Sequence, residues 1–131
     1  VLKTVRKECK KRVIHVFGSA ALRDKTKRPL MGWASSRYAD SIVLTEEDYR
    51  TEDVHHIINE IASGIPAGVE VHRYPDRSEA IAFALSEAKS GDTVIITGKG
   101  HEKSIARGNI EYPWSDQEAV KKIMRTYAKK N

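Results

Sequence analysis

The sequence predicts an α/β domain with a mostly parallel sheet and helices on both of its faces. Short runs of β-branched residues alternate along the 131-residue chain with helical patterns of about a dozen residues, and this alternation is typical of βαβ units. Because a crossover helix connects parallel strands, we expect the strands to share one sheet. The length fits one domain, since the usual prior is roughly 150 residues per domain.

Four apolar runs are predicted to be the strands of this sheet. The first is rich in β-branched and aromatic residues and stops at Gly18, and the fourth is the most strand-like segment of the chain. The third alternates between apolar and polar residues, as a half-exposed strand does. The runs cover residues 13–17, 41–45, 69–74 and 93–97.

The first helix of the βαβ pattern is predicted after a charged loop. Pro29 suits its first turn, because proline is tolerated where the backbone N–H has no helical partner. Its apolar residues lie mostly on one side of the helix. They are Leu30, Met31, Trp33, Ala34 and Tyr38.

The later helices carry clearer start and stop signals. Asp53 is expected to cap a helix that stops before Gly64. Asp76 is expected to cap the next helix, with Glu79 as its capping-box partner. Ser115 is the predicted cap of the last helix, which extends to about residue 127.

Two segments near the ends of the chain do not follow the alternation of strands and helices. Residues 105–112, with Gly108-Asn109 in the middle, predict a short β-hairpin near the C-terminus. Residues 1–12 hold six lysines and arginines against one glutamate and are interpreted as an exposed basic lead-in or linker, with the domain proper at residues 13–131. A nucleic-acid-binding arm is the alternative, but no aromatic residue occurs before Phe17, so no nucleic-acid partner is expected.

Composition excludes several other classes. Hydrophobic residues make up 40% of the chain and charged residues 31%, and the net charge is +5, as in a soluble globular protein. No apolar run approaches the roughly 20 residues of a membrane-spanning helix, so no membrane partner is expected. The single cysteine, Cys9, cannot form an internal disulfide, and no signal peptide is visible, so we expect a cytoplasmic protein.

Three loops are selected as candidate sites because ligands of parallel sheets bind outside the carboxyl ends of the strands. The first, residues 18–28, has small residues followed by cations directly before a helix, an arrangement that favours anions. Arg23, Lys25 and Arg28 are expected to contact a phosphate or carboxylate. A solvated charged loop is the alternative, and the G-x-G-x-x-G spacing of dinucleotide sites is absent.

The second loop, residues 46–53, combines several acids with one arginine. Glu47 and Asp48 could hold an ammonium group while Arg50 binds a carboxylate through its planar guanidinium, a combination that suits an amino acid. Acids that simply favour the positive end of the following helix are an equally good interpretation.

The third loop, residues 98–104, follows the strongest strand. Gly98 and Gly100 permit a positive φ or the close approach of a substrate, and His101 and Glu102 add polar groups. No segment matches the G-x-x-x-x-G-K-[ST] phosphate loop. No metal site is expected either, because the histidines and Cys9 lack ligand spacing.

Several motifs occur in a characteristic order: Val16-Phe17-Gly18, Arg23-Asp24-Lys25, Lys27-Arg28-Pro29, Met31-Gly32, Asp76-Arg77-Ser78-Glu79-Ala80-Ile81, Gly91-Asp92 and Gly98-Lys99-Gly100-His101-Glu102. Together they resemble the C-terminal domain of the Mur ligases, most closely the MurE-type tripeptide synthetases, over residues 12–124. The resemblance implies a Rossmann-like domain of an enzyme of peptidoglycan precursor synthesis. In that family ATP phosphorylates the carboxylate of a UDP-N-acetylmuramoyl peptide, and the amine of an added amino acid then attacks the acyl phosphate.

The resemblance also implies roles for individual residues. Catalytic roles fall to Arg23 and Lys25, and nucleotide binding falls to Asp24, Lys25 and Arg28. Binding of the added amino acid falls to Arg23, Glu47, Asp48, Arg50, Gly98, Gly100, His101 and Glu102. ATP and Mg²⁺ would be held mainly by a central ATPase domain that this chain does not contain, so the chain alone should bind no cofactor and be inactive.

Two points stay open. Family members that add diaminopimelate carry Asp-Asn-Pro-Arg where this chain has Glu47-Asp48-Tyr49-Arg50, so the added amino acid is not determined. The alternative function is a stand-alone, non-catalytic α/β module that binds an anionic metabolite or a protein partner. A reading frame that continues upstream into a phosphate loop would favour the ligase.

Overall fold

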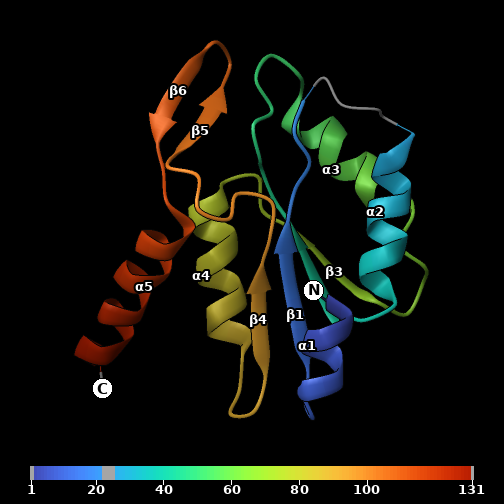
Figure 1. Cartoon of the computed structure of the whole chain (residues 1–131), viewed down its shortest axis with the longest axis vertical. Helices are drawn as coiled ribbons and strands as arrows, with labels where there is room; N and C mark the ends of the chain where they lie inside the picture. The colour runs from blue at the N-terminus through green and yellow to red at the C-terminus, as the bar shows by residue number, and fades with distance from the viewer. Residues whose placement is uncertain (1, 22–25, 131) are drawn as a thin grey trace.

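Four parallel strands form the central sheet of the structure, a computed structural model that describes residues 2–21 and 26–130. In spatial order they are β3 (Glu70–Arg73), β2 (Ser41–Leu44), β1 (Val13–Phe17) and β4 (Thr93–Ile96) (Figure 1). The predicted parallel sheet and its four strands are therefore confirmed.

Alternate residues of the strands build two cores, one on each face of the sheet. Val13 and Phe17 of β1 belong to the first core, which the helix α3 (Val54–Ala62) covers. Ile14 and Val16 belong to the second, which α4 (Arg77–Glu87) covers. The helix α5 (Asp116–Lys130) adds partly buried apolar residues to the second core. This two-sided burial explains why the strands are almost continuously hydrophobic.

The predicted helix starts are confirmed by their hydrogen bonds. The Asp53 side chain accepts a bond of 2.9 Å from the backbone N–H of His55, and the Asp76 side chain accepts one of 3.0 Å from that of Glu79. Ser115 accepts from the N–H of Glu118 at 3.3 Å, at the start of α5. Each cap satisfies a backbone donor that has no partner inside its helix.

The helix α2 (Lys27–Ser36) forms as predicted, and of its apolar residues Met31 packs against the first core. Leu30 and Trp33 are 63% and 49% exposed, whereas the buried residues are Arg28, Gly32 and Ser35. A Cβ at Gly32 would lie 2.2 Å from the carbonyl oxygen of Ile61, so α2 approaches α3 through its small residues. Close backbone packing at Gly32 therefore helps to set the orientation of α2.

The basic lead-in contains a short helix, α1 (Leu2–Glu8). Leu2, Val5 and Cys9 are partly buried and pack against the first core, while the lysines face outward. Part of the segment therefore contacts the sheet, and a domain boundary after residue 12 stays a prediction.

The predicted hairpin is also present. Its strands β5 (Ser104–Arg107) and β6 (Ile110–Pro113) pair antiparallel, and Gly108 has a φ of +62° at the turn. The hairpin lies beyond the carboxyl ends of β1 and β4, near the loops selected above (Figure 1). None of the described helices is both long and apolar enough to cross a membrane.

Candidate functional site

The second and third loops meet at the carboxyl edge of the sheet. The ammonium of Lys99 lies 2.8 Å from Oδ1 of Asp48 and 3.4 Å from Oε2 of Glu102. The carboxylate of Glu47 lies against Gly98, where a Cβ would come within 2.9 Å of Oε2 of Glu47. Three acids of the predicted amino-acid site are thus gathered around two residues of the third loop.

Lys99 is the buried cation of this group. Its side chain is 1% exposed, so its charge must be compensated locally, and the pairs with Asp48 and Glu102 do so. The sequence placed this lysine between two glycines but gave no indication that it would be buried. We therefore interpret Lys99 as the residue that fixes the third loop to the second.

Asp48 is held firmly by its neighbours. Its Oδ1 accepts a hydrogen bond of 2.8 Å from Lys99 and another of 2.8 Å from the backbone N–H of Ala106 in β5. Burial works in the opposite direction, but these bonds hold the pKa of Asp48 below its usual value. Asp48 therefore stays ionised and joins both loops to the hairpin.

Glu47 behaves differently although it is the adjacent residue. Burial raises its pKa to about 7, and the cations Arg77 and Lys99 offset only part of that effect. Within residues 2–21 and 26–130, no hydrogen bond to its carboxylate is formed. Of the acids gathered here, Glu47 is the one that an arriving ammonium group would stabilise most, because a cation would lower its raised pKa.

Arg50 is presented by the hairpin. It has a φ of +51°, and its backbone bonds to β5 on both sides, with its N–H donating to Ala106 and its carbonyl accepting from Gly108. The residue is exposed. A left-handed backbone is costly for a residue other than glycine, so the hairpin contacts maintain a conformation that the loop alone would not favour.

The remaining residues of the third loop are open to solvent. Gly98 and Gly100 have φ values of +106° and +53°, as their sequence context predicted, and nothing lies within 4 Å of a Cβ built at Gly100. Gly100 and His101 line a groove of about 470 Å³ that continues along α5. His101 bonds to Gln117 at 3.3 Å, and the side chain of Glu102 is 57% exposed.

Of the charged residues expected to act in the first loop, only Arg28 lies within the described part of the chain. Arg23, Asp24 and Lys25 lie outside the described residues. Arg28, expected to bind a nucleotide, is fully buried, and its guanidinium pairs with Glu52 at 2.6 Å and with Glu60 at 2.7 Å. A nucleotide would have to compete with these two carboxylates for the guanidinium, and the nucleotide-binding role of Arg28 stays a prediction.

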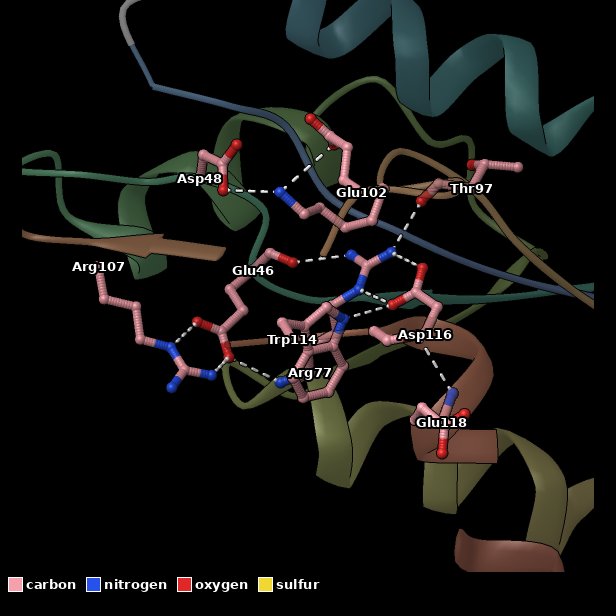
Figure 2. Close-up of polar contacts among 11 residues, drawn as sticks. Glu46, Asp48, Arg77, Thr97, Glu102, Arg107, Trp114, Asp116 and Glu118 are labelled. Atoms are coloured by element: carbon pink, nitrogen blue, oxygen red, sulfur yellow. Dashed lines mark hydrogen bonds and ion pairs between the residues drawn. The ribbon is translucent and has the colours of Figure 1, made fainter. Parts of the chain in front are cut away.

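Sequence analysis missed a buried network behind the site (Figure 2). Its centre is Arg77, whose guanidinium bonds to both oxygens of Asp116 and to two backbone carbonyls. Glu46 accepts two bonds of 2.7 Å from Arg107 of the hairpin. Arg77 follows the helix cap directly and Asp116 follows Ser115, so both looked like ordinary exposed residues at helix starts.

A second buried group lies in β1. The His15 side chain bonds to Ser35 and Thr97 at 2.8 Å on either side, and burial lowers its pKa to about 4. Its folded pKa is below the unfolded value of 6.5, so the unfolded chain binds a proton that the folded chain does not, and stability falls as the pH drops from 6.5 toward 4. The raised pKa of Glu47 acts the other way, and stability falls as the pH rises from 4.5 toward 7.

These opposite effects predict a nearly flat free energy of unfolding between pH 5 and 7. Glu47→Gln removes one of them, so the variant should become more stable by roughly 2 kcal/mol as the pH rises from 5 to 7. Urea denaturation at a series of pH values measures this, with Glu111→Gln on the exposed strand β6 as the control that keeps the wild-type profile. A Glu47→Gln profile as flat as that of the wild type would contradict the prediction.

Comparison with known proteins finds relatives of one family. The family model described as "Mur ligase, glutamate ligase domain" matches residues 1–100. The chain is 44% identical over 124 residues to the UDP-N-acetylmuramoyl-L-alanyl-D-glutamate–2,6-diaminopimelate ligase of Aquifex aeolicus, covering 95% of this chain and 26% of that protein. It is 46% identical over 121 residues to the UDP-N-acetylmuramyl-tripeptide synthetase of Borreliella afzelii, covering 90% and 24%.

A solved structure of a UDP-N-acetylmuramoyl-L-alanyl-D-glutamate–2,6-diaminopimelate ligase is also similar. It has a TM-score of 0.92 and 34% identity, and the match covers 97% of this chain and 26% of that one. The chain therefore spans about a quarter of the length of each of these relatives.

Proposed function

The chain belongs to the Mur ligase family, and we propose that it is the C-terminal, amino-acid-binding domain of an ATP-dependent ligase that extends a UDP-N-acetylmuramoyl peptide. The observation that carries the proposal is the meeting of the second and third loops, where Glu47 and Glu102 lie beside Gly98 and Lys99. The Aquifex aeolicus relative is named as a ligase of UDP-N-acetylmuramoyl-L-alanyl-D-glutamate, and the Borreliella afzelii relative as a UDP-N-acetylmuramyl-tripeptide synthetase. We propose the ligase reaction, its substrates and a partner domain for this chain together.

The roles of the residues follow from their charges and exposure. Glu47 and Glu102 would hold an ammonium group of the added amino acid, since both carboxylates retain lone pairs that no described residue uses fully. Arg50, exposed on the hairpin side, would bind a carboxylate. Asp48 would act through Lys99 and Ala106, keeping the loops in place. Roles for Arg23, Asp24 and Lys25 rest on the family resemblance.

ATP and Mg²⁺ would be held mainly outside this chain. Among the described residues, no group of three or more His, Cys, Asp or Glu side chains is placed to hold a metal ion, and Arg28 is enclosed by carboxylates. ATP would activate the carboxylate of the peptide as an acyl phosphate. This domain would orient the amine of the amino acid toward that carbon, and closure over the site would exclude water.

Glu102→Gln in the intact ligase tests the proposal. The substitution removes one charged contact to the ammonium, so we expect kcat/KM for the added amino acid to fall by about tenfold to a hundredfold, which corresponds to roughly 1.5–3 kcal/mol. The KM for ATP should stay unchanged. Steady-state assays with a series of diamino acids measure the effect and also identify the preferred substrate.

Glu111→Gln, on the exposed strand β6, provides a matched loss of a carboxylate away from the site. Both variants should unfold at a similar urea concentration. If Glu102→Gln has the kcat/KM of the wild type for every amino acid that the ligase accepts, Glu102 is not part of the amino-acid site and the assignment fails.

A further inference from the structure

Arg77 connects the two loops from behind. It is the first residue of α4 and is fully buried. Its guanidinium donates one bond of 2.9 Å to the carbonyl of Glu46 and one of 3.0 Å to the carbonyl of Thr97 (Figure 2). Glu46 directly precedes Glu47 of the second loop, and Thr97 directly precedes Gly98 of the third. One side chain therefore bonds to the backbone where both loops begin.

The guanidinium is itself fixed. Asp116 at the start of α5 accepts bonds of 2.8 Å from Nε and 2.9 Å from a terminal nitrogen of Arg77, and it also accepts one of 2.7 Å from the indole of Trp114. Arg77 bonds lower the pKa of Asp116 in spite of its burial, so the carboxylate stays charged. With two bonds to one carboxylate, the guanidinium plane has a single orientation.

The hairpin is attached to the same assembly. The carboxylate of Glu46 accepts a bond of 2.9 Å from the backbone N–H of Arg77 and two of 2.7 Å from Arg107 in β5. These two acids and two arginines balance in charge, which makes their burial tolerable. The second loop is thereby held between α4 and the hairpin.

We propose that Arg77 is a positioning residue that sets the distance between the Glu47 loop and the Gly98 loop, and thereby shapes the amino-acid site without touching the substrate. The effect of Arg77 on catalysis rests on the proposed function. The positioning of the two loops by Arg77 does not depend on that function. The guanidinium makes four bonds from three nitrogens spread over one plane, whereas a lysine ammonium has three donors on a single nitrogen, so lysine should not replace it.

Hydrogen exchange of the 131-residue chain tests whether Arg77 holds the two loops in place. Both cores are formed by the chain itself, so it can be studied alone. In Arg77→Lys, the amides of residues 47–50 and 98–102 should exchange at least tenfold faster than in the wild type, relative to the amides of β1. Ile61→Ala is the control for general destabilisation, because Ile61 is fully buried in the opposite core and takes no part in the hydrogen bonds of Arg77.

The outcomes are distinct. If Arg77→Lys accelerates exchange in the loops no more than Ile61→Ala does, the inference is wrong. Should Arg77→Lys not fold, Asp116→Asn takes its place. That variant leaves the bonds to both carbonyls possible but weakens the fixation of the guanidinium, and the same two loops must again exchange faster than in Ile61→Ala.

Kinetics of the intact ligase separate this inference from the proposed function. Arg77→Lys should raise the KM for the amino acid by about tenfold or more with little change in the KM for ATP, since small misplacements of binding groups are costly. Faster loop exchange with an unchanged amino-acid KM in both Arg77→Lys and Glu102→Gln would confirm the positioning of the loops and overturn the assignment of the amino-acid site.

Discussion

Arg28→Ala is expected to lower the free energy of unfolding by about 3–5 kcal/mol, because it removes the fully buried cation that two partly buried carboxylates share. Glu52 and Glu60 are only 14% and 24% exposed, and both bond to the guanidinium of Arg28. The same guanidinium donates to the carbonyl of Ala20 at 3.2 Å. The substitution therefore removes the group that joins the first loop, the end of the second loop and α3.

Urea denaturation of the chain measures this loss. Arg12→Ala is the matched control, because Arg12 also pairs with a glutamate but the side chains of Arg12 and Glu70 are 37% and 49% exposed. An exposed pair of this kind contributes less than about 1 kcal/mol. Equal losses of free energy of unfolding for Arg28→Ala and Arg12→Ala would mean that burial does not increase the contribution of the Arg28 ion pairs to stability. Our interpretation of Arg28 would then be wrong.

Arg28 also shows where sequence analysis reached its limit. Its position in a basic loop before a helix correctly indicated a charged role, but a pattern of residues does not show which charges face each other across the fold. Glu60 lies 32 positions later on another helix. Because local sequence determines strands and caps while pairing of distant charges depends on tertiary packing, the four strands were predicted and the partners of Arg28 were not.

The same distinction holds at the candidate site. The second and third loops follow β2 and β4, the two strands that flank β1, and both leave the same edge of the parallel sheet, so a meeting of these loops could be expected from the sequence. The Arg77 network could not be predicted, because nothing in the local sequence around this helix-start arginine indicates that its side chain is buried. The burial of Arg77 results from α5 closing over α4 and placing Asp116 beside it.

Gly64 is expected to be the most sensitive glycine of the chain. It was predicted as a helix stop, and α3 does end just before it, but the structure gives another reason for a glycine here. A Cβ at Gly64 would lie 1.8 Å from the carbonyl oxygen of Pro29 and 2.5 Å from its carbonyl carbon. These are backbone atoms of α2, so no side-chain rotation can relieve the contact, and α2 and α3 would have to separate.

Gly64→Ala should therefore lower the free energy of unfolding by at least about 3 kcal/mol, at the upper end of the cost of overpacking. Gly68→Ala is the control that separates a steric clash from backbone strain. Gly68 has a φ of +97° with no heavy atom within 4 Å of its Cβ position, so alanine there should cost only about 1 kcal/mol. Urea denaturation compares the two. Because Gly64 sits where the first turn of α2 meets the end of α3, a loss no larger than that of Gly68→Ala would show that the two helices can separate freely, and close backbone contact would then not explain why α2 turns Leu30 and Trp33 toward solvent.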